Sequence, residues 1–282
     1  MHILTRGKES AIRISRWCGA AVLLVVLMAC EQNVDVDLPY QERIVVNGFV
    51  GIPSALSIPR HIHITRTLPP LADADTAQLR IADVTAVIVH KGIEYQLQPT
   101  PDPTQLRMPA EAEQWVGDTV SIRVRGGGMT ALATTYIPAR PTIHKVTVVD
   151  TTTEWGSDIK LIRVTVQGEF GSAIIAWLDR SYPVELAYPM SVWVPPILVP
   201  GPRRAGTGEI TIEMAYYNRG TDEQIALYVY AMDGAFARFR SSYTSGGGPF
   251  SSGGSNPWFN VQGDGIGMFV GASVATDTIR IQ

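Results

Sequence analysis

The chain has 282 residues, enough for one large all-β domain or two smaller sandwiches, and only 17% of its residues are charged. Its 26 glycines and 19 prolines favour many short strands joined by tight turns over a helical bundle. The first 29 residues hold four basic residues and one acidic residue, so the remainder has a formal net charge of −6, against −3 for the whole chain. Nucleic acid is therefore a poor partner for the mature chain, because phosphate binding needs clustered positive charge.

Residues 1–29 have the pattern of an export signal. Basic residues come first, and an uncharged apolar run follows from Trp17 to Ala29. This run is too short to span a bilayer comfortably, since a membrane-spanning helix needs roughly 20 apolar residues. A basic start, a short apolar run and small residues before a cleavage point are typical of a secretory signal. We therefore predict that residues 1–29 are a signal peptide.

The end of this leader predicts a lipid anchor. Leu27–Cys30, with the sequence LMAC, resembles the bacterial lipobox, in which the cysteine is acylated and becomes the first mature residue. We therefore expect a lipid on Cys30 and a tether over residues 30–42. An ordinary signal peptide that is cut near Ala29 stays open as an alternative. The other cysteine, Cys18, lies in the leader, so the mature domain would hold neither a disulfide nor a cysteine metal site.

The first half of the mature chain alternates apolar and polar residues in short runs that turn residues separate. In the run Thr119–Arg125, Val120, Ile122 and Val124 would face inward. Two other runs flank Lys91-Gly92 and predict a β-hairpin. The expected strands are Arg43–Val50, Ile58–Thr67, Val84–His90, Ile93–Leu97, Thr119–Arg125 and Met129–Ile137. They predict an immunoglobulin- or transthyretin-like sandwich over residues 43–138.

The second half, residues 142–282, is predicted to be a second β-rich domain with one short helix. Its expected strands are Ile143–Val149, Lys160–Gln167, Ser172–Leu178, Glu209–Tyr217 and Gln224–Tyr230. The second and third of these would form a hairpin around Gly168–Gly171. Met232–Tyr243 is the predicted helix, because aromatic residues recur there at helical spacing, which core packing explains best. A Gly- and Ser-rich loop follows over residues 244–256.

Three stretches of the chain together resemble one protein family. They are Cys30–Pro39 with Arg43–Gly48, Ala133–Pro138, and Asn256–Asn260 with Gly263–Phe269. Their order is similar to that in the Bacteroidetes lipoproteins grouped as the domain of unknown function DUF4249. The resemblance implies a lipoprotein of the outer membrane, often associated with TonB-dependent transporters, and it implies no chemistry. Acidic residues after Cys30 resemble a surface-export signal of such lipoproteins, although a solvated linker explains them equally well.

Residues that could carry chemistry are scattered along the sequence. His61 and His63 share one strand face, as two metal ligands would, but no third ligand is near them in sequence. The chain has no G-x-S-x-G segment. We therefore expect no catalytic site, no cofactor and no metal. Trp155 and Trp258 lie in polar or Gly/Ser-flanked segments, and exposed aromatic faces there would be candidates for ligand binding.

The sequence thus predicts a non-enzymatic accessory lipoprotein. It would be anchored in the outer membrane through Cys30, face the cell surface, and work with a TonB-dependent transporter in the capture or uptake of an unidentified ligand. A glycan-binding surface module that uses Trp155 and Trp258 stays open as an alternative. An envelope-structural or adhesin protein, and a hydrolase with an unrecognised site, stay open as well.

Overall fold

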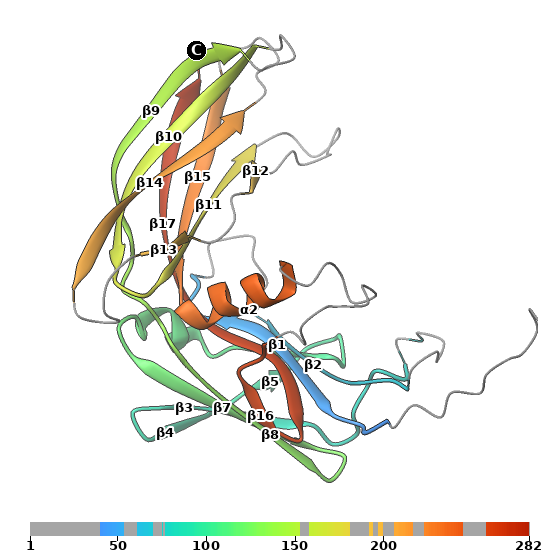
Figure 1. Ribbon diagram of the computed structural model, residues 1–282. Coiled ribbons are helices and arrows are strands. Elements are labelled where there is room, and N and C mark those ends of the chain that lie inside the picture. The colour runs from blue at the N-terminus through green and yellow to red at the C-terminus, as the bar shows by residue number, and fades with distance from the viewer. Residues whose placement is uncertain are drawn as a thin grey trace, which may run out of the picture. The chain divides into compact units, whose positions relative to one another are not determined.

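The structure, a computed structural model, is mainly β with one α-helix among the residues that it describes, which confirms the predicted fold class (Figure 1). Residues 42–282 form one compact unit. The described residues are 40–53, 61–69, 75, 77–152, 158–180, 192–193, 197–199, 206–216, 223–244 and 258–281. The predicted signal peptide, nearly all of the tether and the Gly/Ser loop after Thr244 lie outside the described residues.

The described elements are strands, with one helical segment in each half of the chain. The first half holds β1 (Ile44–Val50), β2 (His61–Arg66), β3 (Thr85–His90), β4 (Ile93–Gln96), β5 (Gln98–Pro99), β6 (Gln105–Arg107), the 3-10 helix η1 (Ala110–Gln114), β7 (Thr119–Gly126) and β8 (Met129–Tyr136). The second half holds β9 (Thr142–Thr152), β10 (Asp158–Glu169), β11 (Ala173–Arg180), β12 (Val192–Trp193), β13 (Ile197–Leu198), β14 (Thr207–Tyr216), β15 (Glu223–Met232), α2 (Gly234–Thr244), β16 (Val261–Gly263) and β17 (Gly265–Ile281).

One long strand, β17, belongs to both halves of the fold (Figure 1). Its first seven residues, Gly265–Gly271, pair in parallel with β1, and the residues from Ala272 onward pair antiparallel with β15. The resulting nine-stranded sheet has the order β12-β11-β15-β17-β1-β2-β6-β5, with β13 also on β11. A five-stranded sheet (β16-β8-β7-β3-β4) and a three-stranded sheet (β14-β10-β9) complete the fold.

The two faces of β17 bury different cores, because successive side chains of a strand point to opposite faces. Phe269 belongs to the core shared with the five-stranded sheet, and Ile279 to the core shared with the three-stranded sheet. Met268, Val270 and Ala272 belong to a third core, which includes residues of α2. Both smaller sheets therefore cover the same side of the long sheet, and α2 packs on the opposite side.

Several local predictions are confirmed. β3 and β4 form the expected hairpin, and both turn residues, Lys91 (φ 49°) and Gly92 (φ 81°), adopt the left-handed backbone that such tight turns require. In β2, Ile62 and Ile64 are buried while His61 and His63 lie on the other face. Val120, Ile122 and Val124 point into the first core, as their alternation predicts.

The hairpin predicted between Lys160–Gln167 and Ser172–Leu178 is wrong. Both segments are strands, but β10 pairs with β9 and β14, whereas β11 pairs with β12, β13 and β15. The turn between them, with Gly171 at φ 76°, carries the chain from one sheet to the facing sheet. The apolar faces of both strands then pack into the same core, which hydrophobic alternation cannot distinguish from pairing side by side.

The predicted division into residues 43–138 and 142–282 is incomplete. The chain does pass from the first sandwich to the second between β8 and β9, through Pro138–Pro141. It then returns, because β16 pairs with β8 and the first half of β17 pairs with β1. Residues 258–271 therefore complete the first sandwich.

Candidate functional site

Of the three residues predicted to carry a lipid or to bind a ligand, the structure describes one. Cys30 and Trp155 lie outside the described residues. Trp258 is described: it is half-buried and packs against the third core beside α2. Its backbone N–H donates a hydrogen bond to the Ser242 Oγ of α2 at 2.9 Å. Trp258 is thus held against the helix, with part of its surface still exposed.

Trp258 is one of a cluster of half-buried aromatic side chains, which we call the aromatic cluster. Helix α2 supplies Phe236 and Phe239, whose ring centroids lie 6.4 Å apart. Phe236 meets Phe49 of β1 edge-on at 6.1 Å, and Phe239 lies 5.9 Å from Phe259. These separations are those of favourable aromatic pairs. The aromatic cluster consists of Phe49, Tyr228, Phe236, Phe239, Trp258 and Phe259.

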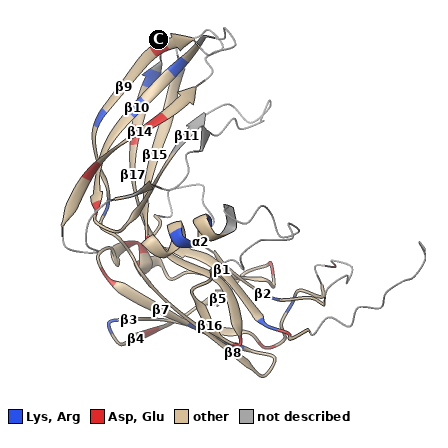
Figure 2. Cartoon of the chain, viewed as in Figure 1, with Lys and Arg blue, Asp and Glu red and all other residues tan. Residues whose placement is uncertain are grey.

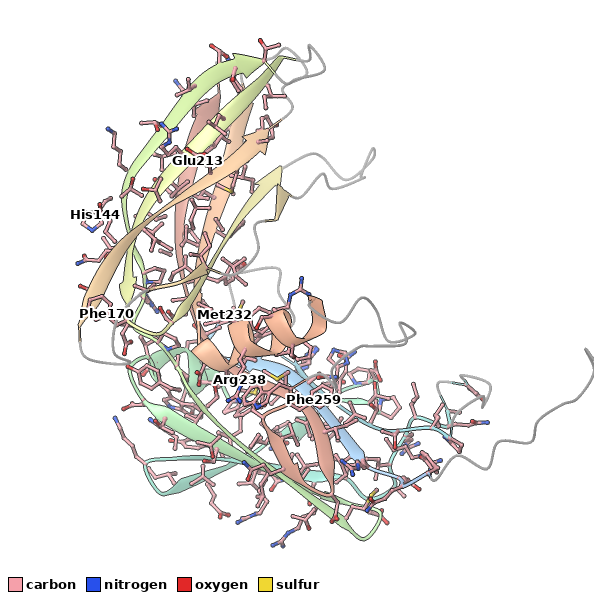
Figure 3. The ribbon with its side chains drawn as sticks, viewed as in Figure 1. His144, Phe170, Glu213, Met232, Arg238 and Phe259 are labelled. Carbon is pink, nitrogen blue, oxygen red and sulfur yellow. The ribbon has the colours of Figure 1, made fainter. Side chains whose placement is uncertain are left out.

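A cation covers part of the aromatic cluster. The guanidinium carbon of Arg238 lies 4.7 Å from the ring centroid of Trp258, within the range of a cation–π interaction. Arg238 is an exposed residue of α2, and Figure 3 labels it together with Phe259. One face of the indole is therefore occupied, which disfavours the stacking of a sugar on that face. Aromatic residues and arginine are, however, the residue types that dominate the energetics of protein–protein interfaces.

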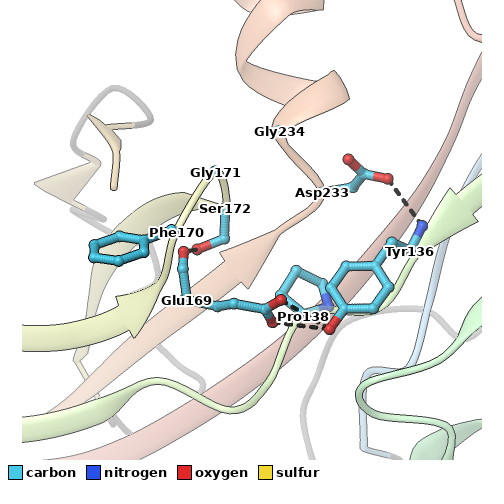
Figure 4. A pocket seen from close by; sticks show the side chains of 8 residues that line it. All are labelled: Tyr136, Pro138, Glu169, Phe170, Gly171, Ser172, Asp233 and Gly234. Carbon is cyan, nitrogen blue, oxygen red and sulfur yellow. Dashed lines mark hydrogen bonds between the residues drawn. The ribbon is translucent and has the colours of Figure 1, made fainter. Parts of the chain in front are cut away.

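A polar cluster joins the two sandwiches around Tyr136, at the end of β8 (Figure 4). The Tyr136 hydroxyl donates to both carboxylate oxygens of Glu169, at 2.9 and 3.0 Å, and the Ala139 N–H donates to the same group at 3.0 Å. The Tyr136 N–H donates to Asp233 Oδ2 at 2.8 Å. Tyr136 is therefore held at its side chain and at its backbone by two buried carboxylates.

Asp233 has a second role at the start of α2. Its Oδ1 accepts the Ala235 N–H at 3.1 Å, so it caps the helix N-terminus. Its Oδ2 also accepts the Thr135 hydroxyl at 3.1 Å, and Thr135 Oγ1 in turn accepts the Gly271 N–H at 2.7 Å. One side chain thus connects α2, β8 and β17.

The hollow beside this polar cluster is small. Its empty volume is about 160 Å³, part of it open to solvent, and it is lined by Tyr136, Pro138, Glu169, Phe170, Gly171, Ser172, Asp233 and Gly234. Sites for small organic ligands are typically about 300–1,000 Å³. The two carboxylates are also engaged by the protein itself. The hollow is therefore a feature of the joint between the sandwiches and a poor ligand site.

His90 and Asp118 form the one His–carboxylate pair among the described ion pairs. Their Nε2 and Oδ2 atoms are 2.9 Å apart, and the Lys91 Nζ lies 2.8 Å from the same oxygen. The hydrogen bond from Lys91, and then the one from His90, hold the pKa of Asp118 below its ordinary value of 3.8. His90 stacks on Trp115 at 4.6 Å and is only 8% exposed. The imidazole is therefore mostly covered, while Asp118 keeps 27% of its side chain exposed.

Among the residues that the structure describes, the remaining charged groups of both signs are mixed. Figure 2 shows Lys and Arg interspersed with Asp and Glu along the strands. Arg123 pairs with Glu94 at 2.8 Å and Arg163 with Glu213 at 2.6 Å. Within the described ranges, no three His, Cys, Asp or Glu side chains come together as a metal site would require. No helix in the same part of the chain is long and apolar enough to cross a bilayer.

These observations define a mainly-β protein of two sandwiches that share one strand, with a half-buried aromatic surface on the side of its helix. Residues 31–172 match the model of the domain of unknown function DUF4249, which is half of the chain. The chain belongs to this family. A comparison with curated proteins gives no match.

Motif residues at the two ends of the described chain meet on β17. Asn47, in the VVNG segment of β1, accepts the Met268 N–H through its Oδ1 at 3.2 Å. Asn260 brackets Phe269: its Oδ1 accepts the Phe269 N–H at 2.9 Å, and its Nδ2 donates to the Phe269 carbonyl at 2.6 Å. Both asparagines therefore fix the strand that the two sandwiches share.

Sequence reasoning missed Asp233 and Tyr136, and it did not predict the partners of Glu169. Asp233 carried a usable signal, because aspartate directly before a helical pattern is a preferred N-cap. The predicted helix began at Met232 instead, which placed Asp233 inside it. Glu169 and Tyr136 carried no local signal, since their partners lie in distant segments.

Proposed function

We propose that the protein is a non-enzymatic lipoprotein of a Bacteroidetes-type outer membrane, where it serves a TonB-dependent transporter as an accessory in ligand capture or uptake. The observation that carries the proposal is the leader that ends in Leu27–Cys30. Membership of the DUF4249 family supports it. The compact unit begins at Glu42, so Cys30 lies outside it. A lipid there, facing the cell surface, would hold the compact unit through the tether expected over residues 30–42.

The surface that would bind the partner is the aromatic cluster with Arg238. It combines half-buried aromatic rings with an exposed guanidinium, the composition that protein interfaces use for their strongest contacts. The hollow at the joint is too small to serve a small-molecule ligand in its place. Through this surface the protein would bind a partner protein, and such binding needs no catalytic group.

The anchor is tested by metabolic labelling with an alkyne fatty acid in a Bacteroidetes host. The wild type should incorporate the label and fractionate with the outer membrane. Cys30→Ala should lose both properties, because acylation needs the thiol. Cys18→Ala is the matched control: it removes the other cysteine of the chain and should label as the wild type does. An unlabelled wild-type protein in the soluble fraction would end the proposal.

The partner is tested by affinity purification in mild detergent. A transporter barrel should co-purify with the wild type. The double variant Arg238→Glu/Trp258→Ala should lose at least ten-fold of that recovery, because both the charge and the ring of the surface are removed. Arg163→Glu is the control, since Arg163 is an exposed arginine on the three-stranded sheet. Recovery of no barrel with labelled, membrane-bound wild type would refute the transporter role and leave the anchor intact.

A further inference from the structure

The joint between the sandwiches combines packing with hydrogen bonds. The third core packs Phe49 and Ile52 of the first sandwich with Ala173 and Ile175 of the second. The hydrogen bonds across the joint are those that Tyr136 and Ala139 donate to Glu169, those that Thr135 and Tyr136 donate to Asp233, and the one that the Ser273 hydroxyl donates to the Ala139 carbonyl at 3.0 Å.

β17 crosses the joint at Gly271, and hydrogen bonds hold its backbone there. The Gly271 N–H donates to Thr135 Oγ1 at 2.7 Å, and its carbonyl accepts the Asp233 N–H at 2.9 Å. The position must be glycine, because a Cβ there would lie only 2.0 Å from the carbonyl oxygen of Tyr136. The second crossing segment, residues 138–141, belongs to no strand. The hydrogen bonds to Tyr136 and Asp233 therefore help to set the angle between the sandwiches.

We propose that Tyr136 is the lock of a hinge between the two sandwiches. Glu169, on the second sandwich, holds its hydroxyl, and Asp233, beside α2, holds its backbone N–H. Glu169 is 9% exposed and Asp233 is 5% exposed, so water competes little for these bonds. Release of the hydroxyl lets the second sandwich turn about β17 at Gly271. This inference does not rest on the proposed function.

Double electron–electron resonance tests the lock. The full chain would carry Cys18→Ser and Cys30→Ser, which remove its two native thiols. Spin labels would be placed on Leu132→Cys in the first sandwich and Val149→Cys in the second, at side chains that are 48% and 45% exposed. The protein with native Tyr136 should give one narrow distance distribution.

Tyr136→Phe should at least double the width of that distribution. Tyr95→Phe is the matched control. Tyr95 is partly buried against the first core, and its hydroxyl makes no hydrogen bond to another described residue. Removal of this hydroxyl should leave the distribution narrow. The double variant Tyr136→Phe/Glu169→Gln separates mobility from stability. It removes the buried charge that loses the hydroxyl and keeps an amide oxygen for the Ala139 N–H, so it should melt closer to the wild type than Tyr136→Phe does, yet remain broad.

A narrow distribution for folded Tyr136→Phe would overturn the lock, as would a broad distribution for the protein with native Tyr136. Should Tyr136→Phe fail to fold, the width of the double variant decides: a broad distribution supports the lock, and a narrow one overturns it.

Discussion

At the scale of single residues, Gly271 has the least room for a side chain among the glycines in the part of the chain that the structure describes. A Cβ there would meet the Tyr136 carbonyl oxygen at 2.0 Å, the Tyr136 carbonyl carbon at 2.5 Å and the Ile137 nitrogen at 2.8 Å. All three are backbone atoms, which cannot move aside as the end of a flexible side chain can. The cost of a side chain at this position is therefore steric.

We predict that Gly271→Ala lowers the free energy of unfolding by about 3 kcal/mol or more, at the upper end of overpacking effects. Gly92→Ala is the control, because Gly92 has φ 81° but open space around its Cβ position. It should cost only about 1 kcal/mol of backbone strain. Urea denaturation of both variants measures the difference, and equal losses would contradict the steric explanation.

Asp118 makes the stability of the first sandwich sensitive to acid. Its pKa in the folded chain is held below 3.8 by Lys91 and, to a lesser extent, by His90. The folded chain therefore binds the proton less readily than the unfolded chain does. Folding gains stability from this group above pH 3.8 or so and loses it as the pH falls through the lowered pKa.

We predict that Asp118→Asn is less stable than the wild type at pH 7 and that the difference shrinks as the pH falls below about 4. Thermal melts between pH 7 and pH 2.5 measure this convergence. Lys91→Met, which removes the first cause of the shift, should give a smaller pH-dependent loss than the wild type. Arg123→Met is the control for Lys91→Met: it removes a cation that pairs with Glu94 and not with Asp118, so its pH-dependent loss should match that of the wild type. If the stability difference between the wild type and Asp118→Asn does not change with pH, ionisation of the Asp118 carboxylate is not its source.

At the scale of elements, α2 is joined to the sheets by its own N-cap. Asp233 caps the helix through Ala235 and also accepts hydrogen bonds from Thr135 and Tyr136 of β8. Gly234, the first residue of the helix, has low helix propensity. The aromatic face of α2 and this cap therefore decide where the helix lies.

We predict that Asp233→Ala lowers the free energy of unfolding by about 2–4 kcal/mol, more than the roughly 1 kcal/mol of a lost cap, because buried donors of β8 lose their acceptor as well. Asp233→Asn retains a carbonyl oxygen and should lose less. Guanidinium denaturation compares the two variants. A loss near 1 kcal/mol for Asp233→Ala would mean that Asp233 is only a helix cap.

At the scale of the whole molecule, the shared strand couples the two sandwiches. β17 contributes Phe269 to the first core and Ile279 to the second, so neither core is complete without it. The first sandwich also takes Val261 of β16 from the end of the chain. The two halves should therefore unfold together, although the sequence lays them out one after the other.

We predict that a fragment of residues 42–139 does not fold alone, because β1 loses its parallel neighbour and the first core loses Phe269. The same fragment with residues 258–271 joined through a Gly/Ser linker should recover a cooperative thermal transition. Circular dichroism of both fragments checks this. Folding of residues 42–139 without the joined segment would show that the shared strand is dispensable for the first sandwich.

The sequence by itself determined the features that depend on near neighbours. The alternation in Thr119–Arg125 predicted the buried face of β7, and Lys91-Gly92 predicted a hairpin, because strand faces and tight turns are set within a few residues. The aromatic spacing predicted α2 for the same reason. The signal peptide and the lipid on Cys30 also depend on local sequence alone, and they stay predictions.

Only the tertiary structure decided which segments meet. Tyr136 and Asp233 are 97 residues apart in sequence, and Asn47 and Met268 are 221 apart. Alternation shows that a strand buries one face, but it does not say which sheet the strand joins. The hairpin predicted between β10 and β11 was wrong for this reason, and the shared strand β17 could not be foreseen. Pairing over such separations depends on the free energy of the whole fold, which no short window of sequence contains.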